Sequence, residues 1–365
     1  HAVQTYGGTE TETYEIVSQQ IDHHLKTLVG LIDPNRTVLI ITADHGHIDI
    51  GGYGGHDLDV VRLPFIMMGK HIIPNNYSDI SQHDIAPTIA LLLGIDFPSR
   101  NQGRPLVEMI RISSEDKALA WLSMATQRTR LAETYLRSLD YPPPNREELY
   151  KAEVFLGNGN YAGASELAQL VIEKTDLSMA QASAVRLKRE QILRLLLIIV
   201  IMIPLVFLTL IFRTELLGEA FVSAITTYIM YHAIYWAMNL PYSLSAINSF
   251  NLFWLETMIR IVTSVIAGSI IFVMLLIFRQ FTELAIIRRA IAEFLLLTTF
   301  ITMLPAMYGF WQHGLFITWH LPDTSIFFWH ITSLIQTICF IFTGTIVSFI
   351  IIPLSNPLQN FLARR

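Results

Sequence analysis

An aspartate and a histidine stand side by side, Asp44-His45, at the end of a β-branched apolar run, and a glycine-rich stretch follows them. A carboxylate oxygen and an imidazole nitrogen are both ligands that suit zinc or manganese. The glycines between Gly46 and Gly55 permit tight turns, so that His56 can fold back toward the pair. Spacing alone leaves two interpretations open: a metal site, or a hydrogen bond at the end of a strand.

The segments around this pair predict the elements that position it. Residues 37–43 form a continuous β-branched run, typical of a strand buried on both faces, and residues 63–69 form a second apolar run. Apolar residues at helical spacing predict helices over 11–32 and over 79–93, the latter ending at Gly94. We therefore expect an α/β sandwich with a largely parallel sheet, in which loops after the strands hold the chemistry.

A second neighbour pair, His83-Asp84, lies at the start of the helix predicted over 79–93. A carboxylate there interacts favourably with the positive end of the helix dipole. The position therefore favours a structural role for Asp84 over a role in binding.

Residues 113–190 follow as a predicted helical spacer. Two helices, over 115–138 and 147–173, are divided by the proline run at 142–144, and the second contains a small-residue turn at 156–164. Such a turn is typical of a hairpin of packed helices. We find no second copy of the unit, so a repeat array is not expected.

The last part of the chain predicts an all-α transmembrane bundle. Mean hydropathy is +0.44 and only 15% of residues are charged, which excludes a disordered polymer and argues against an ordinary soluble globule. Residues 1–190 hold 17 Lys and Arg against 24 Asp and Glu, whereas residues 191–365 hold no lysine. A helix of roughly 20 apolar residues crosses a bilayer. Five spans meet that length, at about 191–212, 219–239, 257–278, 289–311 and 327–353.

Positive charge in the short loops predicts the orientation of this integral membrane protein. The loops at 240–256 and 312–326 contain no Lys or Arg. The alternate loops and the tail carry Arg213, Arg279, Arg288, Arg289, Arg364 and Arg365. Because arginine-bearing loops stay in the cytoplasm, we expect residues 1–190 on the extracytoplasmic side.

Composition also excludes some classes of partner and some kinds of cross-link. The net charge of −5 leaves no basic excess, so nucleic acid is not an expected partner. Cys339 is the only cysteine, so an intrachain disulfide framework is excluded. The chain opens on His1, not on methionine, and we interpret it as the later part of an N-terminally truncated protein.

Four motifs, taken in order, resemble one known family. They are Asp44-His45-Gly46, then Gly55-His56, then Arg62-Leu63-Pro64-Phe65, and then the stretch from Ser81 to Ile95 that contains His83-Asp84-Ile85-Ala86-Pro87-Thr88. Together they resemble the alkaline phosphatase superfamily, in particular its type I phosphodiesterase/nucleotide pyrophosphatase and membrane-bound ethanolamine-phosphate transferase branches. The resemblance implies that residues 1–112 are the C-terminal portion of an alkaline-phosphatase-like sandwich domain, ahead of the helical hairpin at 113–190 and the bundle at 191–365.

The resemblance also implies a ligand set. In that family two divalent metals, usually zinc, here with manganese as the alternative, flank a Ser or Thr nucleophile. Asp44 and His45 would ligate the metal that activates the nucleophile, and His56 and His1 would ligate the other. The aspartate of the element that His1 resembles, a further aspartate ligand and the nucleophile have no match here. We therefore expect this chain alone to bind metal weakly, or to bind one ion, and to be inactive.

The function that follows is a membrane-anchored, metal-dependent hydrolase or phosphotransferase acting by in-line attack at phosphorus. Its substrate is a phosphate ester, and the membrane location favours a lipid or a lipid-linked glycan beside the surrounding membrane lipids. The alternative is a degenerate, non-catalytic binding domain on a membrane scaffold or transporter. Sulfate ester hydrolysis ranks lower because no formylglycine-type cysteine is visible.

Overall fold

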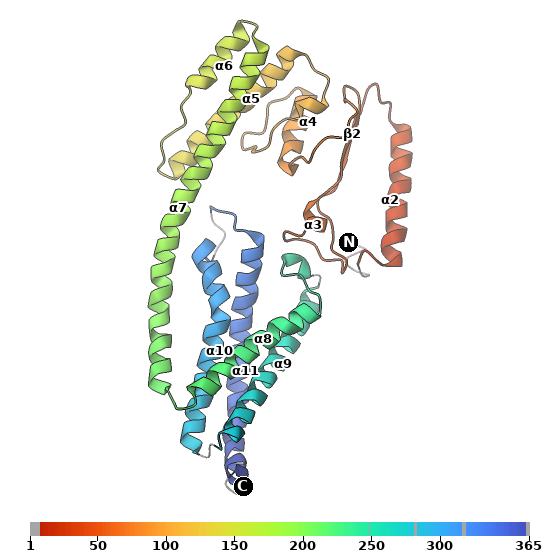
Figure 1. Ribbon diagram of the computed structural model, residues 1–365. Coiled ribbons are helices and arrows are strands. Elements are labelled where there is room, and N and C mark those ends of the chain that lie inside the picture. Colours follow the sequence, from red (N-terminus) through yellow and green to blue (C-terminus); the bar gives the residue numbers. More distant parts are fainter. Residues whose placement is uncertain (1–7, 248, 281–282, 316–318, 363–365) are drawn as a thin grey trace. The chain divides into compact units, whose positions relative to one another are not determined.

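The computed structural model describes residues 8–247, 249–280, 283–315 and 319–362 (Figure 1). The chain divides into two compact units. The membrane unit comprises residues 1–23, 43–63 and 191–365, and the sheet unit comprises residues 24–42 and 64–190. Helix α2 (Glu12–Leu31) confirms the helix predicted over 11–32, and none of its residues is buried.

The sheet unit holds strands β1 (Val38–Thr42) and β2 (Phe65–Gly69), close to the two predicted apolar runs. They pair antiparallel, with Val38 opposite Gly69 and Thr42 opposite Phe65. The expectation of a largely parallel sheet is therefore wrong for the strands in the described part of the chain. A parallel pair needs a crossover, usually a helix that packs on the sheet. The connection at 43–64 contains only the four-residue helix α3 (Leu58–Val61).

Helix α4 (Ile85–Leu93) is held at both ends by local structure. The 3-10 turn η1 (Gln82–Asp84) precedes it and is closed by a capping box, in which Ser81 and Asp84 each accept the other's backbone N–H. Gly94 ends the helix in the left-handed region, with φ of 67°. The structural role predicted for Asp84 is confirmed.

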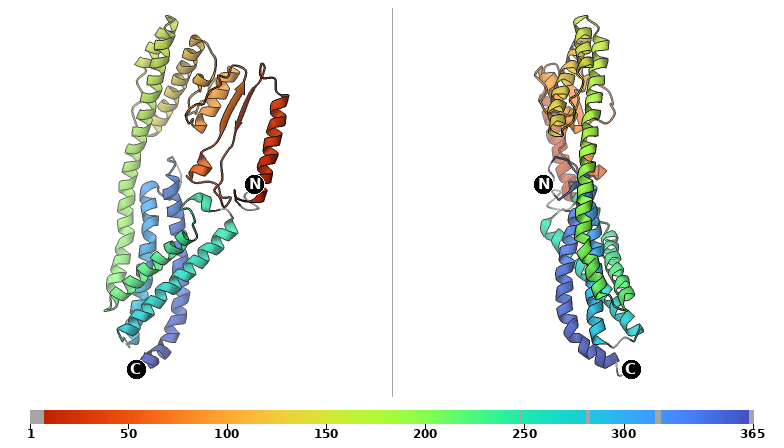
Figure 2. Two further views of the ribbon diagram at one scale, coloured as in Figure 1. Left: turned by 45° about the vertical axis from the view of Figure 1, so that its right-hand side comes forward. Right: turned by 90° about the vertical axis from the view of Figure 1, so that its left-hand side faces the viewer.

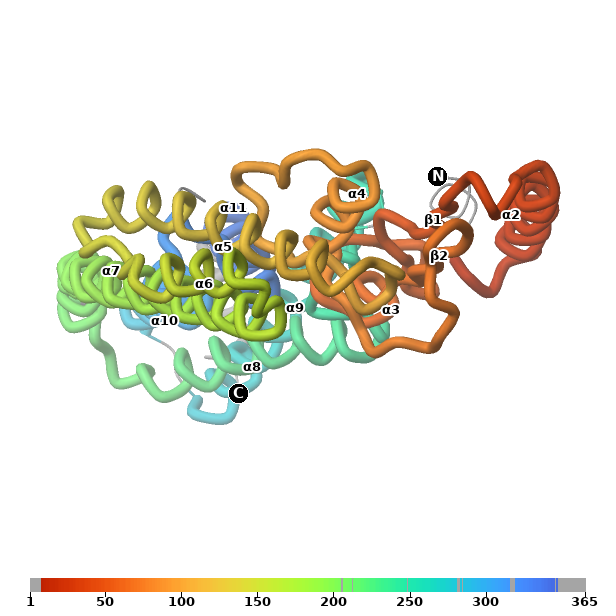
Figure 3. The backbone as a smooth tube through the Cα atoms, turned by 90° about the horizontal axis from the view of Figure 1, so that it is seen from above, coloured from red at the N-terminus to blue at the C-terminus, as the bar shows by residue number. Residues whose placement is uncertain are grey.

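Three helices complete the sheet unit: α5 (Ser114–Ser138), α6 (Glu147–Gly157) and the first part of α7 (Tyr161–Phe212). They lie side by side in Figure 3 and share a core that includes Trp121, Leu149 and Val171. Val107, in the 3-10 turn η2 (Val107–Met109), belongs to the same core. The predicted hairpin turn is confirmed, since α6 ends at Gly157 and α7 starts at Tyr161.

The membrane unit contains α8 (Leu217–Ala237), the 3-10 turn η3 (Leu244–Ala246), α9 (Phe250–Phe278), α10 (Leu284–His313), α11 (Thr324–Leu362) and the second part of α7. In Figure 2, α8 to α11 form a bundle of long helices. Four helices in the described residues are long and apolar enough to cross a membrane, which supports an integral membrane protein: Tyr161–Ile211, Phe250–Phe278, Ala285–His313 and Thr324–Gly344.

The second predicted span, at 219–239, forms as helix α8 but is not among these four. It contains buried Glu219, Ser223 and Thr227 and the tyrosines Tyr231 and Tyr235. Helix α8 packs along α9 and α10. The predicted helix is therefore confirmed, and its crossing of the membrane stays a prediction.

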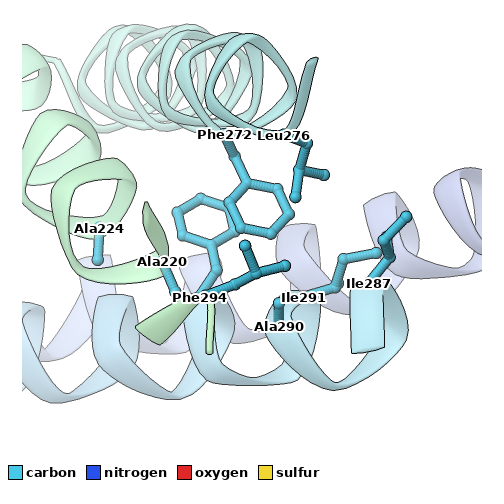
Figure 4. Packing of buried hydrophobic residues seen from close by; sticks show 9 residues of the cluster. Ala220, Ala224, Phe272, Leu276, Ile287, Ala290, Ile291 and Phe294 are labelled. Atoms are coloured by element: carbon cyan, nitrogen blue, oxygen red, sulfur yellow. The ribbon is translucent and has the colours of Figure 1, made fainter. Parts of the chain in front are cut away.

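Small residues let the membrane helices approach one another closely. Ala220 and Ala224 of α8 lie beside Phe272 of α9 and Phe294 of α10 in one buried cluster (Figure 4). The two phenylalanine rings stack with centroids 5.6 Å apart at 12°. Small residues at helix contacts are the usual means of packing in a bilayer, where apolar burial drives association weakly.

Candidate functional site

Asp44 stands two residues after the end of β1, with its side chain 88% exposed. Its Oδ1 accepts the backbone N–H of His45 at 3.0 Å. Hydrogen bonds from the backbone N–H groups of Asp44 and His45, together with the nearby His45 imidazole, hold the pKa of this carboxyl below its ordinary value. Asp44 is therefore an ionised, accessible oxygen donor at neutral pH.

The imidazole of His45 is oriented by the backbone that follows it. Its Nδ1 lies 3.0 Å from the carbonyl oxygen of Gly46. Because a carbonyl only accepts, a neutral ring in this contact would carry its proton on Nδ1 and leave Nε2 to accept or to bind a metal. Metal-binding histidines are oriented in this way, by donating their second nitrogen to a carbonyl or a carboxylate. The ring also stacks on Tyr53, with centroids 4.4 Å apart at 11°.

The two donor atoms face each other. Asp44 Oδ2 lies 3.7 Å from His45 Nε2. Two ligands bound about 2 Å from one tetrahedral ion lie about 3.4 Å from each other, so a small adjustment fits this pair to adjacent corners of one zinc site. The side chain of His45 is 34% exposed. The pair that the sequence singled out is thus brought together in a geometry that suits a divalent cation.

Of the two other predicted ligands, the structure describes only His56. His56 is exposed, and its electrostatic interactions are with Asp57 and Asp323. His1 lies outside the described residues. Within the part of the chain that is described, no three His, Cys, Asp or Glu side chains form a group that could hold a metal ion. Asp44 and His45 are therefore a partial ligand set, and the two-metal centre stays a prediction.

Two further side chains of the glycine-rich loop complete the surroundings of the pair. His47 Nδ1 lies 3.1 Å from the carbonyl oxygen of Gly51, and its ring meets His45 edge-on with centroids 5.0 Å apart. Tyr53 was not singled out from the sequence, because a lone aromatic residue in a loop has no periodic pattern. Its ring contacts both histidines and restricts the rotation of His45.

Asp57 follows His56 and is bound to the chain segment between α8 and α9. Ser245 Oγ donates to Asp57 Oδ2 at 2.5 Å. Burial raises the pKa of Asp57, but hydrogen bonds from Ser243 and Ser245 and the nearby His56 outweigh burial, so the net pKa is below the ordinary value. Asp57 is therefore an ionised acceptor that binds the connection between α8 and α9.

Comparison with known proteins identifies related enzymes. The chain is similar to GPI ethanolamine phosphate transferase 1 of Aspergillus fumigatus, at 24% identity over 200 residues, which is 44% of this chain and 19% of that protein. It is similar to the mouse protein of the same name at 30% identity over 111 residues, 23% of this chain and 12% of the relative. A third relative is GPI ethanolamine phosphate transferase 3 of Schizosaccharomyces pombe, at 30% identity over 107 residues, 28% of this chain and 12% of the relative.

These matches confirm the predicted resemblance and favour its ethanolamine-phosphate transferase branch over the phosphodiesterase branch. The chain spans less than a fifth of the length of the curated relatives it matches. No family model matches the chain. No solved structure matches it either, so the alkaline-phosphatase-like sandwich stays a prediction.

Proposed function

We propose that this chain carries part of the metal site and the membrane bundle of a phosphoethanolamine-type transferase. One observation carries the proposal: Asp44 Oδ2 and His45 Nε2 lie 3.7 Å apart on a loop where the Asp44 side chain is 88% exposed. The names of the related proteins supply the type of reaction.

The residues of the glycine-rich loop would have different roles in metal binding. Asp44 and His45 would hold one divalent ion, zinc or manganese, and His56 would be a ligand of a second. Such ions supply Lewis acidity at phosphorus and lower the pKa of an attacking hydroxyl. The Gly46 carbonyl and the Tyr53 ring keep His45 in the orientation and tautomer that leave Nε2 available. The attacking Ser or Thr is expected outside these 365 residues.

The group transferred would be ethanolamine phosphate. The enzyme hydroxyl would attack phosphorus of a phospholipid donor, and the donor's alcohol would leave with a proton. An acceptor alcohol would then attack the phospho-enzyme and regenerate the hydroxyl. The relatives' names contain GPI, so we propose a lipid-linked glycan as the acceptor. A hydrolase would release free ethanolamine phosphate to water instead, which separates the two reaction classes.

We further propose that the metal loop faces the extracytoplasmic side. The loop binds through Asp57 to Ser245, which lies in the α8–α9 connection, and that connection carries no Lys or Arg. Arginines mark the opposite connection, where Arg279 pairs with Glu219 at 2.6 Å. By the positive-inside rule the arginine-bearing end is cytoplasmic. The soluble part is then on the side of the membrane opposite the cytoplasm.

The test uses the native protein, purified from its own membranes and reconstituted with phosphatidylethanolamine as the donor and a GPI glycolipid as the acceptor. Asp44→Asn removes one carboxylate oxygen from the metal pair and should lower transfer at least a hundredfold, together with the zinc or manganese content. Asp59→Asn is the matched control, because Asp59 is an exposed carboxylate on the following helix α3. It should keep both the activity and the metal.

An unchanged rate of transfer in Asp44→Asn would refute the proposal and favour the non-catalytic scaffold. Ethanolamine phosphate released to water without transfer to the glycolipid would instead assign a hydrolase.

A further inference from the structure

Two segments of the sheet unit carry the acceptor motif for N-linked glycosylation, which is Asn-x-Ser or Asn-x-Thr with x other than proline. They are Asn35-Arg36-Thr37, ahead of β1, and Asn76-Tyr77-Ser78, after β2. The motif is short and arises by chance, so its presence alone does not assign a modification. A glycan is bulky and hydrophilic, so a modified asparagine must lie on the surface and must not be needed by the fold.

Asn35 lies in an exposed turn between α2 and β1 that another residue closes. Asp33 Oδ1 accepts the backbone N–H of Asn35 at 2.9 Å. The Asp33 carbonyl oxygen accepts those of Arg36 and Thr37 at 3.1 and 3.0 Å. An asparagine in a turn usually bonds the backbone through its own side chain, but here Asp33 does so. The side chains of Asn35, Arg36 and Thr37 are all exposed, so the Asn35 amide is accessible.

Asn76 lies in the irregular segment after β2, next to a residue that anchors this segment. The Tyr77 hydroxyl donates to the carbonyl oxygen of Ile73 at 2.9 Å and lies 3.2 Å from that of Glu108. The Tyr77 ring packs against a buried cluster, while Asn76 and Ser78 on either side of it are exposed. This alternation is that of an extended chain. Tyr77 thus holds the segment to the core and leaves the Asn76 amide accessible.

Two other asparagines of the sheet unit serve the fold instead. Asn101 is 9% exposed and donates to the carbonyl oxygen of Gly103 at 2.8 Å. Asn145 accepts the backbone N–H of Glu147 at 2.9 Å. Neither has Ser or Thr two positions later. The two motifs therefore fall on asparagines of a different kind, whose side chains are open to solvent.

Both motifs lie at the same end of the two-stranded sheet. Val38 pairs with Gly69, so the turn before β1 and the segment after β2 are neighbours. The backbone N–H of Lys70 also donates to the carbonyl oxygen of Thr37, at 3.0 Å. Asp44 follows the opposite end of β1. A large substituent at the first end therefore does not cover the end of the strand that leads to the candidate metal pair.

We propose that Asn35 and Asn76 are N-glycosylated, and that the end of the sheet that carries them faces solvent. The co-reactant is an oligosaccharide linked to a lipid diphosphate. The asparagine Nδ2 forms a bond to the anomeric carbon of the first sugar and loses one proton. The bond between that carbon and the diphosphate oxygen breaks, and the lipid diphosphate leaves with the proton. Because this reaction occurs on the extracytoplasmic side, the inference rests on the orientation proposed above, and it is independent of metal binding.

The experiment uses the native protein from its own cells. Peptide N-glycosidase in water enriched in heavy oxygen converts a glycosylated asparagine to an isotope-labelled aspartate, which mass spectrometry locates in the sequence. We expect the label at positions 35 and 76. On a denaturing gel, Asn35→Gln and Asn76→Gln should each remove one step of glycan-dependent mobility, and the double variant should lose both steps.

Two control variants separate the motif from the surrounding loop. Thr37→Ser keeps the motif and should keep the glycan at Asn35, whereas Thr37→Ala should lose it. Asn75→Gln is the matched control for Asn76, because Asn75 is its exposed neighbour but has Tyr77 two positions later. It should leave the label and both steps of mobility unchanged.

The outcomes separate this inference from the orientation and from the proposed activity. Protease added to sealed vesicles with the cytoplasmic face outward shows on which side residues 1–190 lie. A protected domain without label at Asn35 and Asn76 overturns the inference and keeps the orientation, whereas a digested domain refutes both. Label at one position only overturns the assignment of the other. None of these results depends on the transfer activity of Asp44→Asn, which tests the proposed function.

Discussion

Two neighbour pairs of aspartate and histidine in this chain, Asp44-His45 and His83-Asp84, have different surroundings. In Asp44-His45 the carboxylate is 88% exposed, and it contacts the backbone N–H and the ring of the next residue. In His83-Asp84 the aspartate is 6% exposed. Its Oδ2 accepts the N–H of Ser81 at 3.0 Å and its Oδ1 accepts the N–H of Arg104 at 2.8 Å. The first pair is open to solvent, and the second joins the turn at 81–84 to the backbone of Arg104.

The difference teaches which observation separates a candidate ligand from a structural residue. Residue type and adjacency are the same in both pairs. What differs is the origin of the N–H groups that reach the carboxylate. Asp84 accepts a backbone N–H from outside its own pair on each oxygen and is only 6% exposed, so both oxygens serve the fold. Asp44 uses one oxygen for its neighbour, and its other oxygen lies 3.7 Å from His45 Nε2.

Exchanging the same atom in both pairs is the strongest test of this comparison. Asp84→Asn can satisfy only one of the two backbone N–H groups, because its amide nitrogen replaces an acceptor with a donor. An unsatisfied buried group costs about 1–3 kcal/mol, and the loss of charge adds to that, so we expect the sheet unit to lose about 3 kcal/mol. Asp44→Asn should leave the unfolding temperature unchanged. Thermal unfolding in detergent and hydrogen exchange of α4 measure both; equal losses of stability would contradict the comparison.

Thr88 tests the second layer of the Asp84 network. It is fully buried, donates to the Asp84 carbonyl at 2.6 Å and accepts the N–H of Leu106 at 3.0 Å. Thr88→Val keeps the shape but leaves the Leu106 N–H without its acceptor, so we expect a loss of about 1–2 kcal/mol.

The matched control for Thr88 is Thr126→Val in α5. The Thr126 hydroxyl donates only to the Leu122 carbonyl of its own helix, at 2.9 Å. Its replacement should change stability by less than about 0.5 kcal/mol. Hydrogen exchange of the amides of α4 and of Leu106 measures the effect. Equal losses of stability in the two variants would show that the Thr88 hydrogen bonds do not stabilise the fold more than an ordinary helix hydroxyl does.

Local pattern predicted much of this molecule. The β-branched run at 37–43 became β1, helical spacing gave α2 and α4, and apolar length gave the membrane helices. The pair Asp44-His45 was found because adjacent ligands are visible in sequence. The antiparallel pairing of β1 with β2 was not predicted, because the continuous apolar run suggested a strand buried on both faces, as in parallel sheets, whereas β1 is only half-buried and Thr42 is exposed.

Contacts between distant segments had no signal in the sequence. Asp57 and Ser245 are 188 positions apart, and neither belongs to a periodic pattern. The glycines at 52 and 55 indicated close approach of backbone, but the sequence did not say to which segment. His56 was expected to fold back toward Asp44, which stays a prediction; the structure shows that its neighbours Gly55 and Asp57 contact Ser243 and Ser245.

Arg104 allows the test with the smallest expected effect. Its backbone N–H donates to Asp84, whereas its side chain forms an ion pair with Glu108. The guanidinium donates to both carboxylate oxygens of Glu108 at 2.9 and 2.7 Å, and the two side chains are 42% and 37% exposed. Burial raises the pKa of Glu108, but the hydrogen bonds from Arg104 outweigh it and the net pKa is lowered. A lowered carboxyl pKa stabilises the fold above the unfolded value of about 4.3 and loses that contribution as pH falls through the folded value.

Arg104→Met removes the ion pair and keeps the backbone N–H that Asp84 accepts. The pair is partly exposed, so we expect a loss of about 0.5 kcal/mol at pH 7. The loss shrinks in 1 M salt, and it disappears as the pH falls from the unfolded Glu value of about 4.3 through the lower folded pKa of Glu108. Stability measured by hydrogen exchange between pH 3 and 7, at low and high salt, checks this. A loss as large as that of Asp84→Asn would mean that the guanidinium, and not the backbone, holds the buried aspartate. The contrast between the two Asp-His neighbour pairs would then rest on a side chain, and the rule drawn from the origin of the N–H groups would fail.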